Sequence, residues 1–197
     1  SIVTLENIIE INYINFMKIL ILIFLFFFTQ GISQNYKNNL KLENLFNELN
    51  KVNTVEEADQ LENEIWKIWH QHPKNNRLTE KLEFGTSLMF GGDYDYALKV
   101  FDNIIDTDPK WSEAWNKRAT LLYLMNDFDK SLKDINMTLS LEPRHFGALS
   151  GQANIFIKIT EYEKAIKSLK KILKFYPLFK NKELIIKLEK LILEKSI

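Results

Sequence analysis

Residues 112–145 read SEAWNKRATLLYLMNDFDKSLKDINMTLSLEPRH, and this stretch decides the fold. Its second half carries Leu132, Ile135 and Leu139 at helical spacing. The short polar turn Asn126-Asp127 precedes that half, and Pro143 closes it. A proline lacks a backbone donor and cannot continue a helix. The stretch therefore predicts two antiparallel helices joined by a tight turn.

The same pattern recurs along the chain. Pro109, Pro143 and Pro177 stand 34 residues apart, and self-similarity at such a period is typical of a solenoid. Four further positions repeat in register, in the order small, aromatic, small and large apolar: Gly85, Ala119 and Ala153; Tyr94, Phe128 and Tyr162; Ala97, Ser131 and Ala165; Phe101, Ile135 and Leu169. Small side chains let the two helices of a pair cross closely, so the repeat predicts an all-α fold.

This order of residues resembles the tetratricopeptide repeat family. The resemblance covers three repeats, at residues 78–111, 112–145 and 146–177. It implies a right-handed helical solenoid of antiparallel helix pairs. The segments 113–120 and 141–149 look like parts of small exported proteobacterial members of the family.

The regions flanking the repeats also predict helices. Residues 34–77 are interpreted as a degenerate N-terminal helical hairpin, with helices over 36–52 and 55–72. Residues 178–197 are expected to form a C-terminal capping helix, apolar on one face and polar on its outer face, as the end of a stack requires.

The N-terminal 33 residues resemble a signal peptide. Residues 19–28 are ten consecutive apolar side chains, too few for a spanning helix of about 20 residues but suited to a signal core. Lys18 precedes them and Gly31-Ile32-Ser33 follows, so cleavage after Ser33 is expected. A true start at Met17 would account for the residues before it. The alternative is an uncleaved anchor over residues 8–28. The expected location is periplasmic, or membrane-anchored and facing the periplasm in the alternative.

Composition argues against several kinds of chemistry. The chain has no Cys, so thiol chemistry is excluded. Its 26 basic and 26 acidic residues balance, so nucleic acid is not an expected partner. His70 and His72 point apart on a helix, and no metal site or cofactor is predicted. His145 is interpreted as ordering its turn. No catalytic motif is present, so the chain is not expected to be an enzyme.

Arg118 and the tryptophans carry structural predictions. Arg118 stands where the family usually has a buried apolar residue, and burying an unpaired charge costs several kcal/mol. We expect an ion pair with Asp134; the alternative is that Arg118 extends to water. The four tryptophans are expected in the core, with partners for their indole nitrogens.

The resemblance places a binding groove on the first helix of each repeat. The predicted contacts are Thr86, Asn116, Thr120, Tyr123, Ser150 and Asn154. A clamp for a peptide carboxylate is disfavoured, because Leu82, Gly147 and Gly151 occupy its usual basic positions. The alternative is that the groove packs against the chain's own terminal elements. The predicted function is a scaffold or adaptor of the cell envelope that binds another protein or a peptide segment. A membrane-tethered structural subunit with an uncleaved leader is the alternative, and the oligomeric state stays open.

Overall fold

The computed structural model describes residues 16–21, 38–180 and 182–195. The predicted leader and its cleavage site lie outside these residues, apart from a helical stretch at 16–21. The contacts divide the chain between Lys41 and Leu42, and the repeats and cavities belong to the unit that begins at Leu42. Among the described helices, none combines the length and the apolar character that a membrane span requires.

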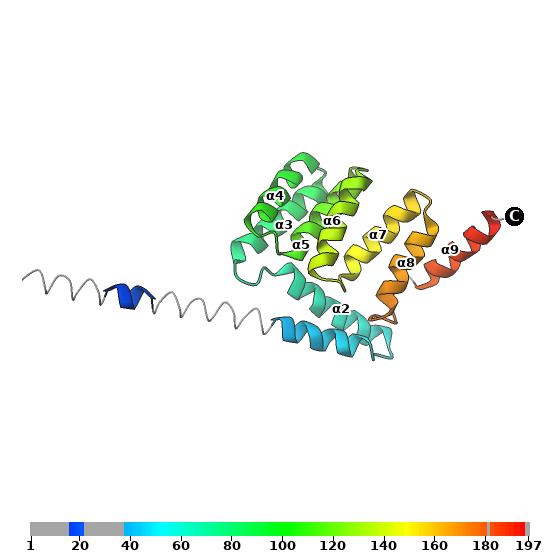
Figure 1. Ribbon diagram of the computed structural model, residues 1–197, viewed down its shortest axis with the longest axis horizontal. Helices are drawn as coiled ribbons and strands as arrows, with labels where there is room; N and C mark the ends of the chain where they lie inside the picture. The colour runs from blue at the N-terminus through cyan, green and yellow to red at the C-terminus, as the bar shows by residue number, and fades with distance from the viewer. Residues whose placement is uncertain (1–15, 22–37, 181, 196–197) are drawn as a thin grey trace, which may run out of the picture. The chain divides into compact units, whose positions relative to one another are not determined.

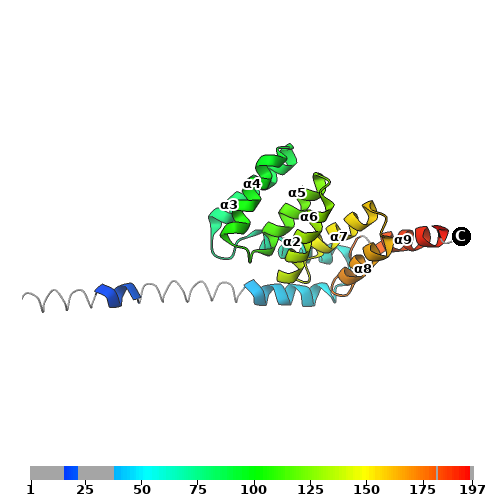
Figure 2. The same cartoon turned by 45° about the horizontal axis from the view of Figure 1, so that its top comes forward.

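The described secondary structure is entirely helical, and its helices form an all-α tetratricopeptide solenoid (Figure 1). A helix over residues 38–49 comes first. The others are α2 (Val55–His70), α3 (Asn76–Gly91), α4 (Tyr94–Thr107), α5 (Ser112–Leu124), α6 (Phe128–Leu141), α7 (Phe146–Lys158), α8 (Tyr162–Leu173) and α9 (Lys182–Lys195). The pairs α3/α4, α5/α6 and α7/α8 correspond to the three predicted repeats, and they lie side by side in both views (Figures 1 and 2).

The turn inside each pair repeats with the same period. Gly92, Asn126 and Thr160 all have a left-handed backbone, with φ of 85°, 62° and 62°. Asp93 and Asp127 then cap α4 and α6 by accepting backbone hydrogen bonds, whereas Glu161 makes no side-chain cap for α8. Glycine and asparagine tolerate a left-handed backbone far better than a β-branched residue. The third turn is therefore the most strained of the three.

The small residues lie where the paired helices cross. A Cβ on Gly85 would lie 2.7 Å from Cε1 of Phe101, so α3 and α4 approach too closely for any larger residue. In the second pair the hydroxyl of Ser131 donates to the carbonyl of Ala119 at 2.7 Å. Ala153 and Ala165 are fully buried in the third. The small residues thus set the distance between the helices of each repeat.

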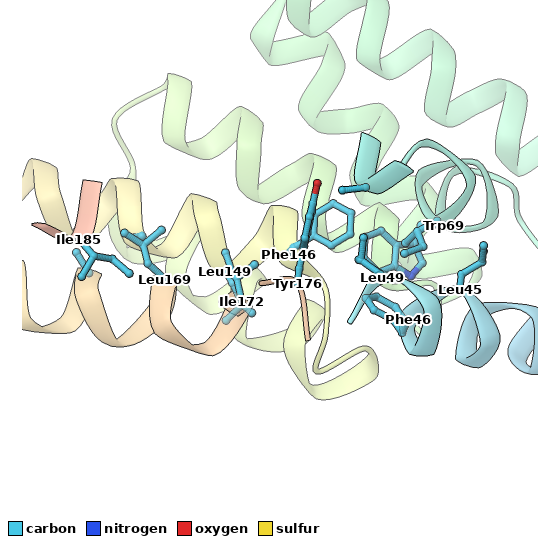
Figure 3. Packing of buried hydrophobic residues seen from close by; sticks show 14 of the residues in the cluster. Leu45, Phe46, Leu49, Trp69, Phe146, Leu149, Leu169, Ile172, Tyr176 and Ile185 are labelled. Carbon is cyan, nitrogen blue, oxygen red and sulfur yellow. The ribbon is translucent and has the colours of Figure 1, made fainter. Parts of the chain in front are cut away.

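The N-terminal hairpin packs on the far end of the solenoid rather than on α3. Phe46, Leu49 and Trp69 share one apolar core with Phe146 of α7 and Tyr176, which follows α8 (Figure 3). Polar contacts add to it. Arg144 makes two hydrogen bonds to Glu43, and the Tyr176 hydroxyl donates to Glu62 at 2.7 Å. The sequence predicted the hairpin but gave no sign that it packs against the third repeat.

The C-terminal helix packs against α8, but its outer face is not wholly polar. Ile185 and Leu188 of α9 are buried in the same core as the N-terminal hairpin. Ile186 and Leu193 are 67% and 68% exposed. The expectation of a polar outer face is therefore wrong for this helix.

Candidate functional site

A cavity of about 340 Å³ lies between α5 and α7, on the face formed by the first helices of the repeats. Its lining residues come mainly from those two helices: Asn116, Ala119, Thr120, Tyr123, Leu124, Ser131, Ile135, Gly147, Ala148, Ser150, Gly151 and Asn154. Five of the six predicted contact residues are among them. The sixth, Thr86, lies elsewhere.

The two walls of the cavity differ in size. On α7, the residues Gly147, Ser150, Gly151 and Asn154 follow the spacing of one helical face, and all have small or short side chains. The α5 wall presents Tyr123 and Leu124, which are larger. A ligand can therefore approach the backbone of α7 closely while it rests against the side chains of α5.

The lining carries neutral polar groups and no Asp, Glu, Lys, Arg or His. Thr120 donates its hydroxyl hydrogen to the carbonyl of Asn116, and the Asn116 amide donates to Glu113 at 3.0 Å. Asn116 is buried, so its side chain is committed to the protein more than the sequence suggested. Asn154 is exposed, and Tyr123 and Ser150 are half-buried. These three are the polar side chains best placed to contact a ligand.

Thr86 lines a second cavity, of about 330 Å³, on the first repeat. The other lining residues are His70, Leu82, Glu83, Ser87 and Phe90. Thr86 uses its hydroxyl to donate to the carbonyl of Leu82. Phe90 is 80% exposed, an unusual position for a phenylalanine. Phe90 thus offers an apolar contact beside Thr86 at the first repeat.

A buried carboxylate lies beside these cavities, under α2. Glu113 is fully buried, and its Oε2 accepts hydrogen bonds from Asn116 and from Nε2 of His145 at 3.0 Å. Its Oε1 lies 3.2 Å from His70 and 3.3 Å from Lys117, without good hydrogen-bond geometry. Burial alone would raise the pKa of Glu113. The hydrogen bond and charge of His145, with the charges of Lys117 and His70, outweigh that effect and lower the pKa to about 2.

His145 orders the start of α7, as the sequence suggested. When the ring is neutral, its Nδ1 accepts the backbone N–H of Ala148 and its Nε2 carries the proton donated to Glu113. The ring stacks on Trp69 with centroids 4.1 Å apart. Glu113 lies on the first helix of the second repeat, but helix α2 covers it.

Helix α2 also contacts Gly147 at the edge of the cavity. A Cβ on Gly147 would lie 2.5 Å from Cη2 of Trp66. The alternative that the groove packs against the chain's own terminal elements therefore holds for Glu113 and Gly147. It does not hold for Thr120 and Asn154, which stay exposed.

Arg118 lies against Asp134, the partner that the sequence indicates. Its Nε and Nη2 donate to the two oxygens of Asp134 at 2.7 and 2.9 Å. Its Nη1 donates to Asp102 at 2.7 Å, and its guanidinium lies over the Trp115 ring. The hydrogen bond to Asp134 is the largest cause that raises the pKa of Arg118. The second acid, Asp102, belongs to α4, so Arg118 joins the first repeat to the second.

The tryptophan predictions hold in part. The indole N–H groups of Trp66, Trp111 and Trp115 donate to Glu62 and to the carbonyls of Trp69 and Pro109. The indole nitrogen of Trp69 is buried without a partner among the described residues, so that expectation is wrong for Trp69. Within the described ranges, no three His, Cys, Asp or Glu residues are grouped as metal ligands.

The third repeat matches a family model. Residues 148–178 match the model described as tetratricopeptide repeat. The 34-residue period and the paired helices extend the same pattern to the two repeats that precede this match. A search of curated proteins returned no match.

Solved structures share the fold. One is the first tetratricopeptide domain of Spaghetti (RPAP3), bound to the HSP90 peptide SRMEEVD. It is 20% identical with a TM-score of 0.55, and the match covers 59% of this chain and 94% of that one. Another is the TPR2B domain of yeast Sti1 in a complex with pHsp70, 20% identical with a TM-score of 0.51, covering 62% of this chain and 98% of that one.

Proposed function

We propose that the chain is a non-catalytic scaffold or adaptor that binds a segment of another protein in the cavity between α5 and α7. The observation that carries the proposal is the cavity itself, with its exposed Thr120 and Asn154 and its small-residue wall on α7. The two similar structures, one bound to an HSP90 peptide and one in a complex with pHsp70, support a role in protein binding.

The lining chemistry favours an uncharged ligand segment. Backbone amides and neutral side chains of a ligand would pair with Asn154, Ser150 and Tyr123, while Leu124 offers an apolar contact. A carboxylate placed here would lose its hydration without meeting a cation, because no Lys, Arg or His lines the cavity. An acidic peptide such as SRMEEVD is therefore expected to bind weakly.

A Gly151→Leu variant of the full chain tests the site by filling it. A Cβ on Gly151 meets only Cδ1 of Ile135, at the ordinary distance of 3.7 Å, so the fold should accept a side chain there. Gly91→Leu is the matched control, because a Cβ on Gly91 meets nothing within 4 Å and Gly91 does not line this cavity. Uncharged peptides selected from a displayed random library on the wild-type chain serve as probes.

We expect the selected peptides to bind the wild type and Gly91→Leu alike, and Gly151→Leu at least tenfold more weakly. Circular dichroism would show that both variants are folded. Equal binding to Gly151→Leu would refute the cavity as the site. Preferential binding of SRMEEVD over the selected peptides would refute the proposed ligand chemistry.

We further propose that the chain acts in the cell envelope, exported to the periplasm by its N-terminal leader. The support is the ten-residue apolar run at 19–28 with Lys18 before it and Gly31-Ile32-Ser33 after it. Mass spectrometry of the protein from the native cell should find a mature N-terminus at Gln34. An intact leader in the membrane fraction would instead favour the tethered structural subunit.

A further inference from the structure

The outward face of α8 is rich in lysine. Lys167 and Lys171 of α8, with Lys174 at its C-cap, are exposed and form no ion pair with the described residues. The other two lysines of α8 are paired, Lys164 with Glu161 at 3.3 Å and Lys170 with Glu189 of α9 at 2.9 Å. Residues 158–197 contain eleven lysines and five glutamates. This end of the solenoid therefore carries an excess of positive charge.

Two exposed apolar side chains lie beside these lysines. On α9, Ile186 and Leu193 stand three residues before and four residues after Glu189, so they share one side of the helix with it. Glu189 contacts Lys170, which places that side of α9 next to the lysine face of α8. Ile186 and Leu193 are about two-thirds exposed, at 67% and 68%. We call Lys167, Lys171, Lys174, Ile186 and Leu193 the basic-apolar face.

We propose that the basic-apolar face docks on an anionic lipid surface. Lysines attract the negative headgroups, and exposed branched side chains enter the region between headgroups and acyl chains. A second copy of this chain fits the face less well, because a symmetric contact would bring two lysine-rich ends together. The proposal concerns α8 and α9 and does not depend on a ligand in the cavity between α5 and α7.

A fluorophore on the face reports its burial directly. Because the chain has no Cys, a Leu193→Cys variant of the full chain carries a single label for an environment-sensitive dye. Phe84→Cys gives the control label, since Phe84 is an exposed apolar residue of α3. The probes are vesicles of phosphatidylcholine alone and vesicles that also contain phosphatidylglycerol.

The apolar run at 19–28 is also expected to bind bilayers, so binding of the full chain to vesicles does not by itself test the basic-apolar face. A variant with three lysines of that face replaced separates the two contributions. The triple variant carries Lys167→Gln, Lys171→Gln and Lys174→Gln. Its partition coefficient into anionic vesicles should fall about a hundredfold, because each lysine contributes about fivefold. The matched control replaces Lys99, Lys110 and Lys133, which are exposed on the first two repeats, by Gln.

The proposal expects the label at 193, but not the label at 84, to shift to the blue with anionic vesicles. The shift should fall with added salt and with the three substitutions on the face. An equal response to neutral vesicles, or no effect of the three substitutions, would overturn it. A shift that depends on protein concentration without vesicles would assign the face to a second copy and would also overturn it.

Discussion

Replacing Arg118 by Met is the sharpest test of how the repeats are joined. The change removes the guanidinium from Asp134, whose side chain is only 6% exposed, and leaves its carboxylate buried without a cation. Breaking a buried ion pair on one side costs about 3–5 kcal/mol. Asp102, the other partner, has a side chain that is 47% exposed, and water can replace the lost contact there. Asp102→Asn should therefore cost no more than about 1 kcal/mol.

Urea unfolding followed by circular dichroism measures both costs. The double variant Arg118→Met, Asp134→Leu should recover most of the loss, because an apolar pair of similar volume removes the stranded charge. With the Asp134→Leu single variant measured as well, subtracting both single-variant losses from the double-variant loss gives the coupling energy of the pair. If Arg118→Met destabilised the protein no more than Asp102→Asn, the inference that the buried carboxylate of Asp134 needs the charge of Arg118 would be refuted.

Three further predictions follow from the repeats and from Glu113. Thr160→Gly should stabilise the protein by about 1 kcal/mol, because it relieves a β-branched residue at φ 62°; an unchanged urea midpoint would contradict the strain. Gly85→Val should destabilise the protein by about 1–3 kcal/mol or more, because its side chain would clash with Phe101. The control Gly91→Val should cost less, and equal losses of stability in the two variants would contradict the close crossing of α3 and α4. The lowered pKa of Glu113 contributes stability above its ordinary pKa of 4.5, and this is lost as the pH falls toward about 2. Glu113→Gln should therefore reduce the change in the free energy of unfolding between pH 4.5 and pH 2. If this free energy changed with pH as steeply in the variant as in the wild type, the lowered pKa would be contradicted.

The repeats are predictable from the sequence because each rests on local requirements. Gly85 and Ala119 are small where helices cross, and the prolines stop each second helix. The groove is partly predictable for the same reason, since its lining residues recur on the first helix of each repeat. Asn116 shows the limit. Its type fits a ligand contact, but the side chain is buried and donates to Glu113, a carboxylate that lies against His70 of the distant helix α2.

The position of the N-terminal hairpin depends on contacts that no short pattern encodes. Arg144 meets Glu43 across 101 residues, and Tyr176 meets Glu62 across 114. Each residue taken alone is typical of an exposed helix surface or a connecting segment. Only the folded chain brings them together, so a hairpin that looked like the first layer of the stack packs against its last repeat.

That packing also bears on what the cavity can bind. The N-terminal ends of α5 and α7 carry free N–H groups and partial positive charge, which makes them natural sites for an anion. In this protein, Glu113 occupies the first turn of α5, and His145 accepts the N–H of Ala148 in the first turn of α7. Helix α2 covers both side chains, because Trp69 stacks on His145 and His70 lies against Glu113. Glu113 is thus the anion at the start of α5, and an acidic peptide would have to displace both Glu113 and α2 to reach these helix ends.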